Sequence, residues 1–151
     1  MTVVLHAIAF VIVAAAQRPA ARASTVFETP AGRIEIESTN VNFGMAQANG
    51  PKEYPSAIVA RVFSARPWVM RLIPMAPLEE ERGEVIAWNR VEWRTRGVRY
   101  QPLTPQGTVV ARGNATGRAG QLVAIDLRLF FSDSDPLGHF ASRLQVTLDS
   151  L

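Results

Sequence analysis

The stretch "QLVAIDLRLFF", residues 121–131, decides the fold class of this chain. Every second residue from Val123 to Phe131 is large and apolar, so these side chains share one face of an extended strand. A helix would scatter the same residues around its circumference. On the opposite face, Asp126 and Arg128 alternate with smaller or apolar neighbours, which suits contact with a neighbouring sheet or subunit. The stretch therefore predicts a strand buried on at least one face.

The last residues of the chain repeat this alternation. Phe140, Leu144, Val146 and Leu148 share one parity, and the residues between them are mostly polar. The preceding segment "SDSDPLGH", residues 132–139, contains a Pro and a Gly, which are typical of a turn because Pro fixes φ and Gly tolerates positive φ. The pattern predicts that the closing strand forms a hairpin with residues 121–131.

Shorter stretches of the same kind follow one another from residue 24 onward, separated by turn residues at intervals of about 8 to 15 residues. Segments 47–55 and 78–84 are expected to be a loop and a solvated loop or helical turn, and 65–67 a tight turn or a bend at which the chain changes sheets. We therefore predict an all-β fold, an immunoglobulin-like antiparallel β-sandwich of about eight strands that forms one domain over residues 24–151. The remaining strand-like segments are 32–38, 39–46, 58–64, 68–73, 85–97 and 108–112.

The N-terminal stretch "VVLHAIAFVIVAAA", residues 3–16, is apolar apart from His6. It is shorter than the ~20 residues that a transmembrane helix needs, and it has the length of a signal-peptide core. Residues 21–23, Ala-Arg-Ala, supply the small-x-small pattern that a signal peptidase accepts. We expect residues 1–23 to be an export signal, although the first six residues hold no Lys or Arg. A retained membrane anchor and a buried segment of the domain are the alternatives.

The charge balance gives no reason to expect a nucleic-acid partner. Two of the sixteen basic residues, Arg18 and Arg22, precede residue 24, so 14 basic and 13 acidic residues remain in the expected domain. These charges are mixed along the chain and form no basic block that would match a phosphate backbone. Lys52 is the only lysine, and arginine favours fixed, hydrogen-bonded pairing at strand surfaces over a solvated polycation.

The residues that could support chemistry are few. The chain has no Cys, which excludes disulfides, thiolate catalysis and Cys-based metal sites. His139 is the only histidine outside the expected signal, and residues 132–135, "SDSD", lie close to it in sequence. A catalytic group of His, Ser and Asp and a calcium site are the chemical alternatives there, but two Asp in one turn are too few for calcium, and such residues usually cap backbone amides. We therefore expect no catalytic residue, no metal and no cofactor.

Trp68, Trp88 and Trp93 are the candidate contact residues. Aromatic side chains most often anchor a sandwich core. A planar row of exposed tryptophans would instead form a protein interface or a platform on which sugar rings stack. The sequence leaves these alternatives open.

Two motifs in the second half of the chain resemble known exported domains. Pro67 and Trp68 open an apolar strand, and the ending combines Pro136, Gly138 and Phe140 with a terminal strand. These features resemble bacterial exported β-sandwich domains of the WxL surface-domain and spore-coat-protein-U or pilin-like kinds. They depart from those groups in having Phe140 in place of the usual Tyr, no Trp in the last strand and no Cys pair. The resemblance implies a non-enzymatic component of a cell surface or an appendage.

From these observations we expect a secreted, non-enzymatic protein of the extracellular space or cell envelope, with a structural or adhesive role. Its partners would be other surface or appendage subunits, or copies of itself, joined by pairing between strands at sheet edges. Residues 24–37 are the candidate edge. The membrane would be contacted only by the signal during export. The alternative is a carbohydrate-binding module that binds a glycan through the tryptophans.

Overall fold

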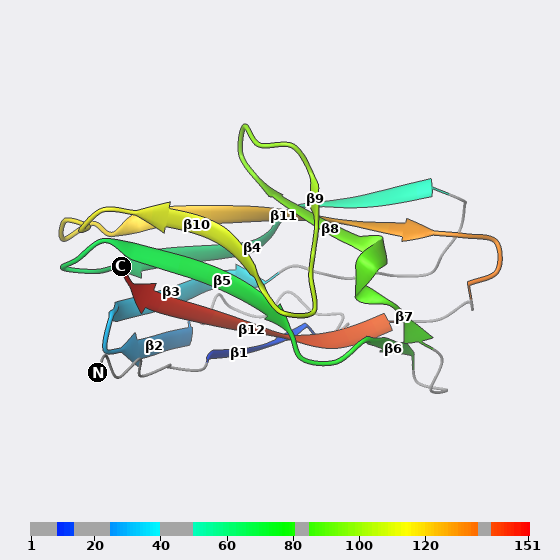
Figure 1. Cartoon of the computed structure of the whole chain (residues 1–151), viewed down its shortest axis with the longest axis horizontal. Coiled ribbons are helices and arrows are strands. Elements are labelled where there is room, and N and C mark those ends of the chain that lie inside the picture. The colour runs from blue at the N-terminus through cyan, green and yellow to red at the C-terminus, as the bar shows by residue number, and fades with distance from the viewer. Residues whose placement is uncertain (1–8, 14–24, 40–49, 81–84, 136–139) are drawn as a thin grey trace.

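The computed structural model describes residues 9–13, 25–39, 50–80, 85–135 and 140–151. They form two antiparallel β-sheets of six strands each, packed against one another (Figure 1). Sheet A has the order β10-β5-β12-β6-β7, with β1 also paired to β12, and its strands are β1 (Ala9–Val13), β5 (Trp68–Pro74), β6 (Leu78–Glu80), β7 (Val85–Ile86), β10 (Thr108–Gly113) and β12 (Phe140–Ser150). Sheet B has the order β2-β3-β4-β11-β8-β9, and its strands are β2 (Thr25–Thr29), β3 (Gly32–Thr39), β4 (Gly50–Phe63), β8 (Val91–Thr95), β9 (Gln101–Pro102) and β11 (Gln121–Phe131).

The predicted all-β sandwich is confirmed, with more strands than expected. The described residues contain twelve strands, because short segments such as β6, β7 and β9 add to the long ones. The chain crosses repeatedly between the sheets, as in immunoglobulin-like sandwiches. The bend at residues 65–67 is one of these crossings, since β4 lies in sheet B and β5 in sheet A.

The core forms between the two sheets from the side chains whose parity predicted it. In β11, the five alternate residues from Val123 to Phe131 are all buried. In β12, Leu144, Val146 and Leu148 are buried and join the same cluster. Their neighbours of opposite parity in β11 are only partly buried, as expected for the outer face of a sheet.

The predicted closing hairpin is wrong. β11 pairs with β4 and β8 in sheet B, whereas β12 pairs with β5, β1 and β6 in sheet A. Placing the two strands in opposite sheets lets their apolar faces meet across the core. The eight residues between them are long enough to bridge the ~10 Å that separates packed sheets. Of this connection, residues 136–139 lie outside the described residues.

The expected loop at 47–55 and helical turn at 78–84 are also corrected. β4 begins at Gly50 and contains Pro51 and Pro55. Between residues 50 and 57 the described structure pairs β4 only with β11, so the other side of β4 has no strand partner there. Proline, which lacks an N–H, is tolerated in such a locally unpaired edge. Leu78 starts strand β6 and is fully buried, and pairing of this strand with β7 and β12 holds the segment extended. Residues 47–49 and 81–84 lie outside the described residues.

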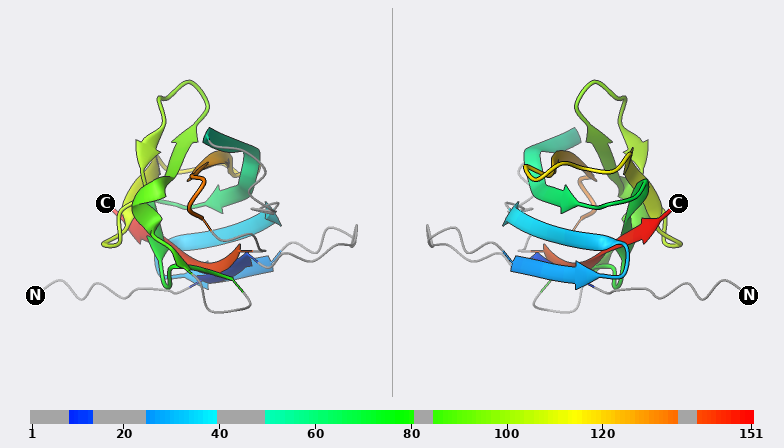
Figure 2. Two further views of the ribbon diagram at one scale, coloured as in Figure 1. Left: turned by 90° about the vertical axis from the view of Figure 1, so that its right-hand side faces the viewer. Right: turned by 90° about the vertical axis from the view of Figure 1, so that its left-hand side faces the viewer.

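The segment expected to be an export signal is described only in part. Residues 1–8 and 14–24 lie outside the described residues, whereas Ala9–Val13 form β1 against β12. Figure 2 places β1 close to β2, along one side of the sandwich. Among the described residues, no helix is long and apolar enough to cross a membrane.

Candidate functional site

The three tryptophans lie in the core. Trp68, Trp88 and Trp93 are 0%, 7% and 5% exposed, respectively. Trp68 comes from β5 and Trp93 from β8, while Trp88 lies in a single 3-10 turn, η1 (Trp88–Arg90), and donates a hydrogen bond from its indole nitrogen to the carbonyl of Ala76. The rings therefore form no exposed row. In this structure they offer neither a stacking platform for sugars nor an interface, and they serve as core anchors.

The polar segment 132–135 is a structural turn. The carboxylate of Asp135 accepts a hydrogen bond from the backbone N–H of Ser132 at 2.7 Å and one from Arg90 at 2.5 Å. The hydrogen bond from Arg90 is the main cause that holds the pKa of Asp135 below its usual value. Within the described ranges, no group of three His, Asp or Glu residues is arranged to hold a metal ion. His139 lies outside them.

Paired charges cover the outer face of sheet B. Arg128 on β11 bonds to Glu92 on β8, and its guanidinium also lies 3.9 Å from a carboxylate oxygen of Glu53 on β4. Two residues further along the same two strands, Arg94 on β8 bonds to Asp126 on β11 at 2.9 Å. This arrangement agrees with the pairing role that the sequence indicated for its arginines. The cross-strand partners could not be assigned beforehand because strand order was unknown.

Tyr100 completes this surface, and no pattern in the sequence pointed to it. The guanidinium groups of Arg94 and Arg128 both approach its ring, with distances from guanidinium carbon to ring centroid of 4.3 and 4.1 Å. Such stacking stabilises the arginines by cation–π attraction while their edges bond to carboxylates. Burial raises the pKa of the Tyr100 hydroxyl. Each of the two arginines therefore contacts both a carboxylate and the ring of Tyr100.

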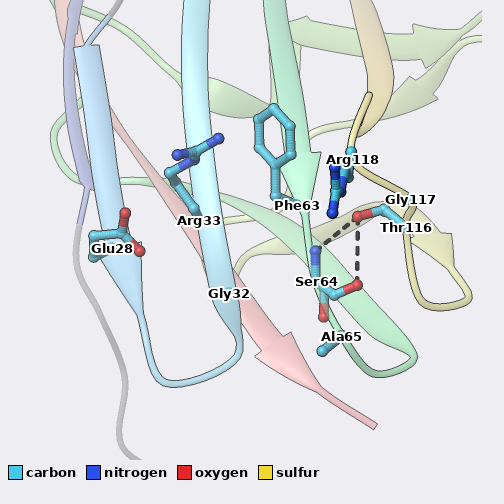
Figure 3. A pocket seen from close by; sticks show the side chains of 9 residues that line it. All are labelled: Glu28, Gly32, Arg33, Phe63, Ser64, Ala65, Thr116, Gly117 and Arg118. Atoms are coloured by element: carbon cyan, nitrogen blue, oxygen red, sulfur yellow. Dashed lines mark hydrogen bonds between the residues drawn. The ribbon is translucent and has the colours of Figure 1, made fainter.

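A hollow of about 500 Å³ opens at one end of the sandwich (Figure 3). The guanidinium of Arg33 lies 4.2 Å from the ring centroid of Phe63 at its wall. The backbone N–H of Ser64 bonds to the hydroxyl of Thr116 at 2.9 Å, and the N–H of Thr116 bonds to the carbonyl of Ser64 at 2.7 Å. These bonds tie the β4–β5 bend to the β10–β11 loop. The polar groups of Ser64 and Thr116 therefore hold two loops together, and the hollow contains no convergent set of reactive groups within the described residues.

The sheet edges are the remaining candidates for interaction. β2 is the outermost strand of sheet B, and β3 lies between β2 and β4. Of the edge predicted at residues 24–37, only β2 therefore has an open side among the described strands. Val26 on β2 is 50% exposed. In sheet A, the flank of β12 that faces away from β5 is occupied by β1 and, at its start, by β6.

The chain matches no family model, no curated protein and no solved structure.

Proposed function

We propose that this chain is an exported, non-enzymatic structural or adhesive component of a cell surface or appendage. In this proposal it associates with copies of itself, or with other surface subunits, through the edge of sheet B. The observation that carries the proposal is the position of β2 at that edge, with Val26 exposed beside backbone groups that have no strand partner among the described residues.

The chemistry of an edge strand supports this role. One side of β2 pairs with β3 from Thr25 to Thr29, so the N–H and C=O groups on its other side are available to a further strand. Main-chain hydrogen bonds would attach that strand, and alternate side chains would set its register. Glu28 is the only charged residue in β2, so few charges oppose such pairing.

The use of polar side chains also favours a structural role. Arg94, Arg128 and Arg90 each bond to a carboxylate on a neighbouring element, and these bonds stabilise the surface. The carbohydrate-binding alternative gains no support from the tryptophans, because their rings are buried.

The test compares the oligomeric state of the intact chain with that of the folded chain cut after Ala23. Light scattering coupled to size-exclusion chromatography should show concentration-dependent association of the cut chain. Val26→Lys should weaken it, because a charged side chain at an edge disfavours pairing. Val98→Lys is the matched control, since Val98 is 43% exposed but lies in a turn outside the strands. A monomer at all concentrations, or equal effects of both substitutions, would refute assembly through β2.

A further inference from the structure

Strand β1 is seated on β12 and lies within the segment expected to be removed on export. β12 therefore has a flank whose partner, Ala9–Val13, is covalently attached only before the signal is cut. The pairing is antiparallel and runs from Ala9 opposite Val146 to Val13 opposite Ser142. Over residues 144–146, β12 is hydrogen-bonded to strands on both sides, β5 and β1.

The backbone hydrogen bonds of β12 show which of its N–H and C=O groups face β1. The carbonyl of Arg143 accepts a hydrogen bond from the N–H of Met75, so the polar groups of Arg143 point toward the β5 side. In an antiparallel ladder the N–H and C=O of successive residues point to opposite sides. The backbone N–H and C=O groups of Ser142, Leu144 and Val146 therefore point toward β1. Without a strand there, these groups would lose their partners.

The occupant of this flank has a defined chemistry. The segment Ala-Phe-Val-Ile-Val contains no charge, no polar side chain, no Gly and no Pro. It combines β-branched and aromatic residues, which favour the extended conformation. The facing strand contributes Leu144 and Val146, which belong to the core. An uncharged apolar strand fits this position, whereas a charged segment would place charge at the margin of the core.

We propose that the flank of β12 from Ser142 to Val146 is a strand-binding site for an uncharged apolar segment. Ala9–Val13 fills it while the chain is uncut, and a segment of the same chemistry from a different protein fills it once residues 1–23 are removed. This inference rests on the exported state in the proposed function. It adds a second, distinct attachment site and a cap that keeps the site closed until the chain is cut.

Among the described strands after residue 24, none is an unpaired apolar segment that could replace β1. Among the strands described after residue 24, the free edge strand β2 contains a Glu and two Thr residues. The other long strands are already paired within their sheets. A vacated strand edge is a template for pairing with another chain. These facts favour a separate partner protein over a second copy as the occupant.

The experiment uses the full-length chain with a protease site introduced between residues 16 and 22, cut after folding. A fluorescent peptide spanning residues 7–15 is then added, and its anisotropy and the melting temperature of the protein are recorded. The peptide should displace the bound fragment, bind with one-to-one stoichiometry and restore the melting temperature of the uncut chain. Failure of the peptide to bind a cut protein from which the fragment has been washed away would overturn the proposal.

Two matched peptides test the hydrogen-bonding pattern. The N–H of Val11 faces Leu144, whereas the N–H of Phe10 points away from β12. Methylation of the Val11 nitrogen should weaken binding about tenfold or more, since it removes a main-chain bond and adds a clash. Methylation of the Phe10 nitrogen should change binding less than about twofold. Equal effects would contradict strand pairing at this flank.

Matched variants of the protein test the same site from the other side. Ser142 pairs with β1 but lies outside the segment that pairs with β5. Ser142→Pro removes one backbone N–H that faces β1 and should reduce peptide binding about tenfold. Ser142→Ala keeps this N–H and should bind the peptide like the parent. Unchanged binding by Ser142→Pro would overturn the assignment.

The outcomes separate this site from assembly through β2. Peptide binding by a strictly monomeric chain would support the β12 site and refute self-association. Self-association that Val26→Lys weakens, without any peptide binding, would support assembly through β2 and refute the β12 site. Dimers that Ser142→Pro abolishes and Val26→Lys leaves intact would show that a second copy fills the flank, which contradicts the partner proposed here.

Discussion

At the scale of single residues, arginine–carboxylate pairs stabilise the outer surface of this protein. Asp126 illustrates the balance: burial alone would raise its pKa, but hydrogen bonds from the backbone of Ser56 and from Arg94 lower it overall. Asp135 is held in the same way, chiefly by Arg90, at the end of β11. Arg90 bonds to both carboxylate oxygens of Asp135, and charge-assisted bonds of this kind are stronger than bonds between neutral groups, so this carboxylate is positioned as well as paired.

The lowered pKa of Asp135 predicts how stability depends on pH. An unfolded Asp has a pKa of about 3.9, so the stabilisation is present above that value and is lost as the pH falls through the lower folded pKa. Asp135→Asn should therefore reduce the free energy of unfolding at neutral pH, and the difference from the parent should shrink in acid. Urea unfolding at about pH 7 and pH 3 measures both values.

Asp133→Asn is the control for this prediction, because Asp133 is an exposed neighbour in the same turn. It should unfold like the parent at both pH values. A deficit in Asp135→Asn that stays constant with pH would show that the carboxylate contributes through its shape and not through its charge.

At the scale of elements, strand contacts depend on where the chain can approach closely. β10 meets β5 with Gly113 opposite Trp68. A Cβ built on Gly113 would lie 2.6 Å from two ring atoms of Trp68, so only glycine fits against the buried indole. A second local irregularity lies in β4, where the pairing register with β11 shifts and Ser56 adopts a φ of +49°. The side chain of Asp126 accepts the N–H of Ser56 at 2.8 Å and satisfies that irregular position.

The contact between β10 and β5 predicts the effect of a single added methyl group. Gly113→Ala should destabilise the protein by about 1–3 kcal/mol, because the buried Trp68 ring has to move. Gly117→Ala is the matched control in the following loop, since a Cβ there would meet no atom within 4 Å. It should change stability by less than about 0.5 kcal/mol. Thermal unfolding followed by circular dichroism provides the comparison, and similar melting temperatures for the two variants would contradict the close packing.

At the scale of the whole molecule, the two sheets share one core that includes all three tryptophans. Trp68 comes from sheet A and Trp93 from sheet B, and Trp88 lies in the turn that precedes β8. This central position explains why the residues with the strongest binding chemistry in the sequence are unavailable for binding.

The shared core predicts the fluorescence of the intact protein. Emission should be blue-shifted relative to free tryptophan and only weakly quenched by iodide, because all three rings are buried. Unfolding in urea should restore the emission and quenching of an exposed indole. N-acetyl-tryptophanamide serves as the reference compound. Strong quenching of the folded protein would show that at least one ring is exposed and would reopen the sugar-stacking alternative.

The sequence by itself determined the fold class and the buried face of β11, whereas in β12 the residues of opposite parity, Gln145 and Thr147, are buried as well. Alternation in β11 and β12 assigned Val123, Leu127, Leu144 and Val146 to the core, and the structure confirms these positions. The reason is that successive side chains of a strand point to opposite faces, so local periodicity is sufficient.

Only the tertiary structure decided which strands are neighbours. The separation of β11 from β12, the seating of Ala9–Val13 on β12 and the Arg94–Tyr100–Arg128 stack all depend on contacts between residues far apart in the chain. Alternation says that a strand has an apolar face but not which face it meets. Likewise, the sequence shows that Trp68, Trp88 and Trp93 are aromatic but not that they are buried, because burial results from both sheets closing over one core.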